Sequence, residues 1–320
     1  MESLQRQTFG DFEVLAVDDG STDETLVLLD DWAADDPRVR VLRSRRRGLV
    51  PALALALDNA HGDLIARMDA DDVAEPTRLD RQVRHLTDQR DLAACGTGVR
   101  YFPRQVVRGG ARRYEAWINS LHTHEEIERD IFIECPVAHP TLAARRRVLT
   151  AVGGYRDMGW PEDYDLVLRL WAAGHRLENL PQVLYHWRER EDRTSRVDPI
   201  YSPARFRQVK VHFLRKTLLA ADRLAIIVGA GPVGKSFARE LAAAGSRTIA
   251  FVDVDPRKVG QEIYGAPVID LDDLTHLAGP RSAHRALVLA AVGQPGARED
   301  IREGCRQLGL VEGKDFIAVA

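Results

Sequence analysis

The alternation of short apolar runs with helical runs constrains the fold of this chain more than any other feature. The run from Phe12 to Val17 predicts a buried strand, and a helical run from Glu24 to Ala33 follows it. Further strands are expected at 38–43 and 64–68, with a helix at 49–60 between them. Strands that alternate with helices in this way predict a doubly wound, mostly parallel α/β sheet.

Two acidic clusters stand where predicted strands end. Asp18 and Asp19 follow the strand at 12–17, and Asp69 and Asp71 follow the strand at 64–68. In doubly wound sheets, ligands bind outside the carboxyl ends of the strands. Both clusters are therefore expected at the ligand-binding edge.

Asp69-Ala70-Asp71 is a DxD motif. Two carboxylates at this spacing suit Mg²⁺ or Mn²⁺, which bind one or two protein carboxylates and complete their shell with phosphate oxygens and water. Taken alone, the motif fits a capped turn before Pro76 equally well. A calcium-binding EF-hand is excluded, because Ala74 occupies the position that requires glycine.

The first acidic cluster has two interpretations. A carboxylate of Asp18 or Asp19 can accept hydrogen bonds from the ribose hydroxyls or base N–H groups of a nucleotide. The structural alternative is that Ser21, Asp23 or, less readily, Asp19 caps the helix that follows.

A third acidic segment opens the helix predicted at 161–173. Glu162 and Asp163 stand at its first turn, where the helix macrodipole favours negative charge. An acidic pair beside Trp160 and after the flexible Gly153-Gly154 is also how a general base can be presented to an acceptor hydroxyl.

At these three segments the chain resembles the family-2 glycosyltransferases of the GT-A type. The segments 18–23 (DDGSTD), 69–72 (DADD) and 162–169 (EDYDLVLR) match that family in order and spacing, and the resemblance covers residues 1–196. It implies a GT-A fold that transfers a sugar from a nucleotide diphosphate sugar to an acceptor hydroxyl, in polysaccharide or glycan biosynthesis. Further matching residues are Arg47-Gly48-Leu49, His139-Pro140-Thr141 and Val152-Gly153-Gly154-Tyr155.

The resemblance also implies roles for donor-binding residues. Asp19 would contact the nucleoside, with Asp18 and Arg47 beside it, and Asp69 would lie near the ribose or the metal. Asp71 would ligate Mn²⁺ or Mg²⁺. The groups that would face the diphosphate are His186 and, with weaker support, Arg193 or Arg196.

For the acceptor side, the resemblance implies that Asp163 is the catalytic base and that Glu162 orients the acceptor or the base. A single carboxylate base would deprotonate the acceptor hydroxyl, which attacks the anomeric carbon from the face opposite the nucleotide and inverts it. A glycosidase would instead need two flanking carboxylates and a water molecule, and no second acid is suitably placed in the sequence.

A second α/β unit is expected near the C-terminus. The apolar strand at 224–228 enters Gly229, Gly231 and Gly234 in a GxGxxG pattern, with Asp253 twenty-four residues after Gly229 (253 − 229). This matches the dinucleotide-binding fingerprint. The unit resembles the small Rossmann-like domains, binding nucleotide or coenzyme A, of polysaccharide-biosynthesis proteins.

No residue in this second unit is a candidate for hydride transfer, so nucleotide binding, regulation or a scaffold role is favoured over oxidoreduction. The expected organisation is a GT-A domain at 1–196, a helical linker at 197–222 and a small Rossmann-like domain at 223–320. An alternative for the whole chain is a nucleotide-binding regulatory protein whose transferase half is inactive.

Composition narrows the partners and the compartment. The formal net charge of -3 disfavours nucleic acid, and the longest apolar run, 49–57, is too short to span a bilayer, so at most peripheral membrane contact is expected. Three cysteines without metal-ligand spacing argue against disulfides and zinc and suit a reducing cytoplasm. The expected partners are a nucleotide-sugar donor, a UDP-sugar above all, and a glycan or lipid-linked acceptor.

The resemblance carries one expectation about the start of the chain. In the family a first strand lies between the strands assigned here to 12–17 and 64–68, and no counterpart precedes Met1 in this sequence. We therefore expect an N-terminally incomplete chain with two unpaired sheet edges, and expect it to be poorly active or unstable.

Overall fold

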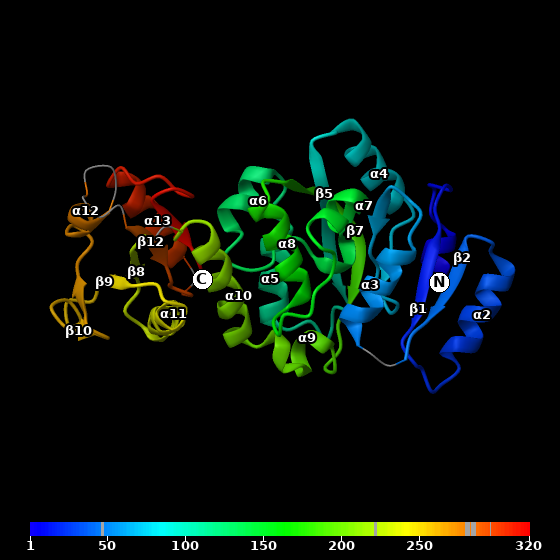
Figure 1. Ribbon diagram of the computed structural model, residues 1–320, viewed down its shortest axis with the longest axis horizontal. Helices are drawn as coiled ribbons and strands as arrows, with labels where there is room; N and C mark the ends of the chain where they lie inside the picture. The colour runs from blue at the N-terminus through cyan, green and yellow to red at the C-terminus, as the bar shows by residue number, and fades with distance from the viewer. Residues whose placement is uncertain (46–47, 221–222, 279–281, 283–285, 295) are drawn as a thin grey trace. The chain divides into compact units, whose positions relative to one another are not determined.

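The computed structural model describes residues 1–45, 48–220, 223–278, 282, 286–294 and 296–320 (Figure 1). The chain packs into two compact units, each of which is formed by two separate segments of the sequence. The first unit holds residues 1–127 and 136–198, and the second holds residues 128–135 and 199–320.

A pair of parallel strands begins the first unit. β1 (Val14–Asp18) pairs with β2 (Val39–Arg43), and α2 (Thr25–Asp35) connects them. α3 (Leu49–Asn59) follows β2 and packs against β1. The predicted order of strands and helices is therefore confirmed here, with bounds that shift by one or two residues.

The larger sheet of the first unit has five strands in the order β3-β6-β5-β7-β4. β5 (Leu92–Phe102) runs parallel to β7 (Arg176–Arg188), and the remaining pairs are antiparallel. Because β5 lies in the middle of the sheet, its first eight residues are buried. The shorter strands are β3 (Leu64–Ala66), β4 (Val73–Ala74) and β6 (Ala143–Arg145).

β1 and β3 are edge strands of two separate sheets in this unit. Over the residues that the structure describes, β1 pairs only with β2, and β3 pairs only with β6. The apolar residues of β1 and Leu64 and Ile65 of β3 are half-buried, whereas the first eight residues of β5 are buried. These are the two edges that the sequence is expected to leave unpaired.

The helices of the first unit cover the sheets and carry much of the candidate site. α8 (Glu162–Ala172) is buried on more than one side, since Leu166, Leu168 and Leu170 are all fully buried, and Gly174 follows it at φ 77°. Burial of each such side chain stabilises the fold by about 1.5–3 kcal/mol. The other helices of this unit are α1 (Glu2–Gln5), α4 (Arg78–Asp88), α5 (Gly109–Ile118), η1 (His139–Thr141), α7 (Arg146–Ala151) and α9 (Thr194–Val197). α6 (His124–Asp130) begins in the first unit and ends in the second.

The second unit is built on a six-stranded sheet in the order β10-β11-β9-β8-β12-β13, parallel except for the β10–β11 pair. The predicted α/β class is confirmed, since β8 and β12 are fully buried between helices. Its strands are β8 (Ala225–Val228), β9 (Thr248–Val252), β10 (Glu262–Ile263), β11 (Ala266–Ile269), β12 (Leu287–Ala290) and β13 (Phe316–Ala318). Its helices are η2 (Pro199–Tyr201), α10 (Pro203–Lys216), α11 (Pro232–Ala243), α12 (Leu274–Leu277) and α13 (Ala297–Gln307).

Buried charges hold residues 128–135 in the second unit. Asp130 lies 2.6 Å from Arg302 of α13, and both side chains are almost completely buried. The buried Lys210 of α10 donates hydrogen bonds to the carbonyl oxygens of Ile133 and Val319. Burial lowers the pKa of Lys210 to about 8. The segment is thus built into the second unit, although its neighbours in sequence belong to the first.

Candidate active site

The DxD motif lies in the loop that joins β3 to β4. The amide of Arg67 donates to the Leu142 carbonyl at 2.8 Å, which extends the pairing of β3 by one residue. The chain then turns, and the amide of Asp72 approaches the carbonyl oxygen of Asp69 at 3.4 Å. This turn places three carboxylates, those of Asp69, Asp71 and Asp72, in different surroundings.

Asp69 is neutralised by its neighbour two residues back. The Arg67 guanidinium, which is buried, contacts both carboxylate oxygens of Asp69, at 2.7 Å and 2.6 Å. Burial acts to lower the pKa of Arg67, but the Asp69 carboxylate holds that pKa above its usual value. A two-point contact of this kind is among the stronger ion pairs in proteins, so Asp69 has little capacity left for a metal.

Asp72 serves the structure of the loop. Its carboxylate accepts hydrogen bonds from the Tyr185 hydroxyl at 2.8 Å and from the Arg188 amide at 2.6 Å. Burial raises the pKa of Asp72 to about 7, and the nearby charge of Asp69 adds to this, while the two hydrogen bonds act in the opposite direction. Asp72 therefore ties the loop to β7.

Asp71 is about as exposed as Asp69, with 35% against 33% of its side chain in contact with solvent, but it lacks the two-point contact with a buried arginine. Its backbone carbonyl accepts a hydrogen bond from Arg188 Nε at 2.7 Å, and its Oδ2 lies 3.3 Å from Nε of Arg190. The side chain is 35% exposed, so an ion arriving from solution can reach it. Of the two predicted metal ligands, Asp71 fits that role better than Asp69.

A second cluster forms around the N-terminus of α8. The buried carboxylate of Glu162 lies 3.5 Å from Nδ1 of His139, whose Nε2 is 3.3 Å from the Tyr155 hydroxyl. Burial, together with the charge of Arg67, lowers the pKa of His139, and Glu162 partly offsets this. Burial raises the pKa of Tyr155 to about 12, with Arg67 acting to lower it. Arg67 therefore couples the DxD loop to this cluster.

Asp163 differs from its two acidic neighbours on α8. Glu162 and Asp165 are buried, whereas Asp163 is half-buried and accepts a hydrogen bond from the next amide, that of Tyr164, at 2.7 Å. Asp165 is bound by Arg169 at 2.7 Å and by the Trp160 indole at 3.0 Å, which fixes the start of the helix. Asp163 is thus the acid of this segment that an acceptor hydroxyl can approach.

The carboxylates at the end of β1 support two turns. Asp18 accepts hydrogen bonds from the amides of Gly20 and Ser21, and Asp19 accepts one from the amide of Gly48 at 2.7 Å. Asp19 therefore reaches the start of α3. Arg47, which is expected beside it, lies outside the described residues.

The three basic side chains that are expected at the diphosphate have acidic partners. His186 Nε2 is 2.5 Å from Glu75, and the buried Glu189 is bracketed by Arg193 and Arg196. The Arg193 guanidinium also lies over the Trp187 ring, 4.4 Å from its centroid. Their expected role at a diphosphate stays a prediction.

The charges of Asp69, Glu162 and Asp163 all act to raise the pKa of Tyr155. Sequence reasoning missed the residues that organise these side chains, above all Arg67. A signal was available, because an arginine that closes an apolar strand just before a DxD motif needs a buried partner.

The glycine-rich loop of the second unit packs as the fingerprint predicts. Gly229 has φ 106°, and a Cβ on Gly234 would lie 1.9 Å from the Gly229 carbonyl oxygen, so helix α11 approaches the loop closely. Asp253 accepts from the amide of Ala230 at 2.9 Å and from Lys258 at 2.8 Å. Although burial opposes it, these contacts lower the pKa of Asp253.

Around Gly231 the loop is open. No heavy atom lies within 4 Å of a Cβ built on Gly231, whereas Asp253 is turned towards its own loop. The space beside Gly231 is where a phosphate would approach the helix N-terminus.

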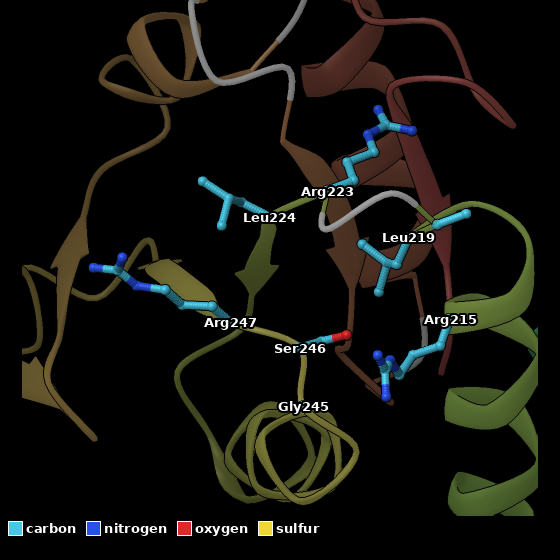
Figure 2. Close-up of a pocket in the computed structure, with 8 residues that line it drawn as sticks. Arg215, Leu219, Arg223, Leu224, Gly245, Ser246 and Arg247 are labelled. Atoms are coloured by element: carbon cyan, nitrogen blue, oxygen red, sulfur yellow. The ribbon is translucent and has the colours of Figure 1, made fainter.

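A separate cavity of about 170 Å³ lies at the other end of the strands in the second unit. Figure 2 shows the side chains of Arg215, Arg223 and Arg247 leaving its wall in different directions. Arg223 donates to the carbonyl oxygen of Lys314 at 2.7 Å. The three guanidinium groups do not converge on one point, so the cavity is not a ready anion site.

The donor set suits a metal held jointly with a ligand. Among the described residues, no cluster of three or more His, Cys, Asp and Glu side chains could hold an ion by itself. A cation at Asp71 would therefore complete its shell with phosphate oxygens and water, as Mg²⁺ and Mn²⁺ commonly do. No helix of the described chain is both long and apolar enough to cross a membrane.

Solved structures similar to this chain are α/β glycosyltransferases. Staphylococcus aureus TarS 1–349, in complex with UDP-GlcNAc, aligns with a TM-score of 0.56 at 19% identity, over 75% of this chain and 66% of that one. The mannosyltransferase PcManGT of Pyrobaculum calidifontis, in complex with GDP-Man and Mn²⁺, aligns with a TM-score of 0.52 at 19% identity, over 76% and 69%. The predicted GT-A type fold is confirmed.

Sequence comparison defines the family. The model for glycosyl transferase family 2 matches residues 1–153. EpsE of Bacillus subtilis (strain 168) is 33% identical over 211 residues, which cover 63% of this chain and 71% of EpsE. The amylovoran biosynthesis glycosyltransferase AmsE of Erwinia amylovora is 29% identical over 60% of this chain and 70% of AmsE. The chain belongs to glycosyl transferase family 2 and is a glycosyltransferase.

Proposed function

We propose that this protein transfers a sugar from a nucleotide diphosphate sugar to an acceptor hydroxyl, with inversion, in polysaccharide biosynthesis. The observation that carries the proposal is that the acidic residues of the first unit differ in burial and in their partners. Asp71 faces solvent at the DxD loop, while Asp163 is accessible at the N-terminus of α8 beside the buried Glu162–His139 pair. The relatives support the setting, since AmsE is named for amylovoran biosynthesis.

The donor side is proposed to use a divalent cation, Mn²⁺ or Mg²⁺, at Asp71. When bound, such a cation supplies Lewis-acid stabilisation of the departing diphosphate. Asp69 stays paired with the buried guanidinium of Arg67 and keeps that side chain in place. The complexes of TarS with UDP-GlcNAc and of PcManGT with GDP-Man and Mn²⁺ support this class of donor.

Asp163 is the proposed general base. It takes the proton of the acceptor hydroxyl while the acceptor oxygen bonds to the anomeric carbon, and the bond from that carbon to the diphosphate breaks with its electron pair leaving on the diphosphate. Glu162 is the proposed orienting group. Its contact with His139 fixes the first turn of α8, so it can position the acceptor or Asp163.

The remaining contacts with the donor are proposed by position. Asp19 and Asp18 would hold the nucleoside at the end of β1, with Arg47 beside them. His186 would face the diphosphate from β7, an arrangement that requires it to exchange its contact with Glu75. The basic residues that would assist it are Arg193 and Arg196.

For the second unit we propose nucleotide binding at the Gly229–Gly234 loop, with a regulatory or scaffold role. Gly229, Gly231 and Gly234 shape the loop, and Asp253 closes it. A boundary near residue 222, with a helical linker at 197–222, stays our proposal for the independently folding parts. We further propose a cytoplasmic protein with at most peripheral membrane contact and a glycan or lipid-linked acceptor.

The experiment that tests this function is a donor panel. UDP- and GDP-sugars are incubated with the protein with and without Mn²⁺, and release of the nucleoside diphosphate is measured. We expect metal-dependent turnover of one nucleotide class, with UDP the first expectation. Metal-dependent nucleotide binding without any turnover would favour the alternative, a regulatory protein with an inactive transferase half. If the protein neither binds nor turns over any donor of the panel, both the transferase proposal and the regulatory alternative are overturned.

A further inference from the structure

A side chain of the protein itself occupies the position where the proposed metal would bind. Arg190 Nε lies 3.3 Å from Oδ2 of Asp71 and 3.6 Å from Oδ1 of Asp192. Arg190 is half-exposed, and Asp192 stands mostly in solvent. The guanidinium therefore bridges the candidate metal ligand and a second carboxylate on its own loop.

The two residues before Arg190 fix its position. Arg188 donates its amide to Asp72 at 2.6 Å and its Nε to the carbonyl of Asp71 at 2.7 Å. The amide of Glu189 donates to the carbonyl of Phe102 at 2.7 Å, and its carboxylate is buried. Because these hydrogen bonds hold the backbone at Arg188 and Glu189, the end of β7 places Arg190 next to Asp71.

The three acids of the DxD loop differ in how firmly they are held. Asp69 has a buried arginine on both oxygens, and Asp72 is buried against Tyr185. Asp71 has a single contact, at 3.3 Å, with a cation that is 50% exposed. Exposed ion pairs of this kind are weak and exchange readily with solvent. Of the three, the Asp71 contact is the one that an incoming ion can replace.

We propose that Arg190 is a built-in counterion of the metal site, which a divalent cation displaces from Asp71 and which Asp192 then receives. A dication and a guanidinium on the same carboxylate repel each other, so one must leave before the other binds closely. Metal affinity is thereby set by a competition within the protein. This inference rests on the proposed metal-dependent function.

The test is a calorimetric titration of Mn²⁺, with UDP present at a fixed concentration to supply phosphate oxygens, into the wild type and three variants. We expect Arg190→Gln to bind Mn²⁺ about two- to five-fold more tightly, the scale of an exposed ion pair. Arg190→Lys keeps the charge and should stay close to the wild type. Arg108→Gln is the matched control, because Arg108 pairs with Glu191 on the same loop at 3.0 Å and its loss changes the net charge equally.

A double-mutant cycle separates contact from general charge. In an Asp71→Ala background, Arg190→Gln should have no further effect on Mn²⁺ binding. An unchanged or weaker affinity of Arg190→Gln, an equal gain in Arg108→Gln, or the same gain in the Asp71→Ala background would each overturn the counterion role. If Asp71→Ala binds Mn²⁺ as tightly as the wild type, the proposed metal assignment fails instead, and the inference fails with it.

Discussion

Two arginine–carboxylate contacts, one in each unit, are built for opposite purposes. In the second unit, Arg302 and Asp130 are both almost fully buried at 2.6 Å, and Arg302 also holds Glu312 at 2.7 Å. In the first unit, Arg190 and Asp71 are 3.3 Å apart and open to solvent. The first contact cannot open without leaving a charge inside the protein, whereas the second can exchange partners.

The difference teaches that a charged pair must be judged by its surroundings. Charge removed from a buried network leaves an uncompensated partner in a medium of low dielectric, so the fold loses stability. Charge removed from the candidate site leaves groups that water can solvate, so function changes while the fold persists. Variants in the two units should therefore separate stability from activity.

The largest expected effect is on stability in the second unit. Arg302→Met removes the buried cation of Asp130 and leaves this carboxylate with the half-exposed Arg129, at 2.9 Å, so we expect the free energy of unfolding to fall by about 3–5 kcal/mol. Urea denaturation measures it. The control is Arg306→Met on the same helix, where an exposed pair with Glu303 is lost and the change should stay within about 0.5 kcal/mol. Equal stability of the two variants would break the comparison.

Asp163→Asn tests the opposite case. It should lower transfer by about 10²-fold or more, the usual scale for a lost general base, and leave the free energy of unfolding unchanged. Steady-state rates with the active donor and parallel denaturation curves measure both. A rate within a few-fold of the wild type would place the base elsewhere, with Glu162 the first suspect. A large loss of stability would make Asp163 a structural acid like Asp165.

The buried Lys210 gives the second unit a pH dependence. Its pKa falls from 10.5 to about 8 on folding, so between these values the unfolded chain holds more protons and the free energy of unfolding rises with pH. Relative to Lys210→Met, the wild type should gain about 1–3 kcal/mol between pH 7.5 and pH 10. Denaturation of both proteins at the two pH values decides it. A constant difference between them would mean that Lys210 keeps its ordinary pKa in the fold.

The smallest expected effect concerns the exposed pair. Arg190→Gln should change the free energy of unfolding by less than about 0.5 kcal/mol, because both of its partners stay hydrated. Thermal unfolding of the wild type and the variant in the absence of metal measures this change in stability. A loss comparable to that of Arg302→Met would show that Arg190 is part of the fold and remove its freedom to exchange.

Local patterns were enough to predict the framework of the molecule. The alternation of strands and helices from residue 12 to residue 68 is reproduced within a few residues, because it depends on periodicity and on turn residues. The acidic segments could be placed at strand and helix ends for the same reason. β7, however, begins at Arg176, since parallel pairing with β5 includes polar residues that periodicity does not mark as part of a strand.

The partners of the site could not be predicted in the same way. Tyr185 binds Asp72 across 113 positions of sequence, and Arg190 reaches Asp71 from the end of a different strand. Such contacts depend on strand order and register, which no local pattern encodes. Likewise, nothing in residues 128–135 indicates that they pack in the second unit, since Arg302 lies 172 positions further on.

That separation has a consequence for the order of events during synthesis. The segment around Asp130 leaves the ribosome 172 residues ahead of the arginine that buries with it. At about 5–20 residues per second, the gap amounts to roughly 10–30 seconds. During that time the segment around Asp130 is exposed without its final partner, and the contact is completed only when helix α13 has been synthesised.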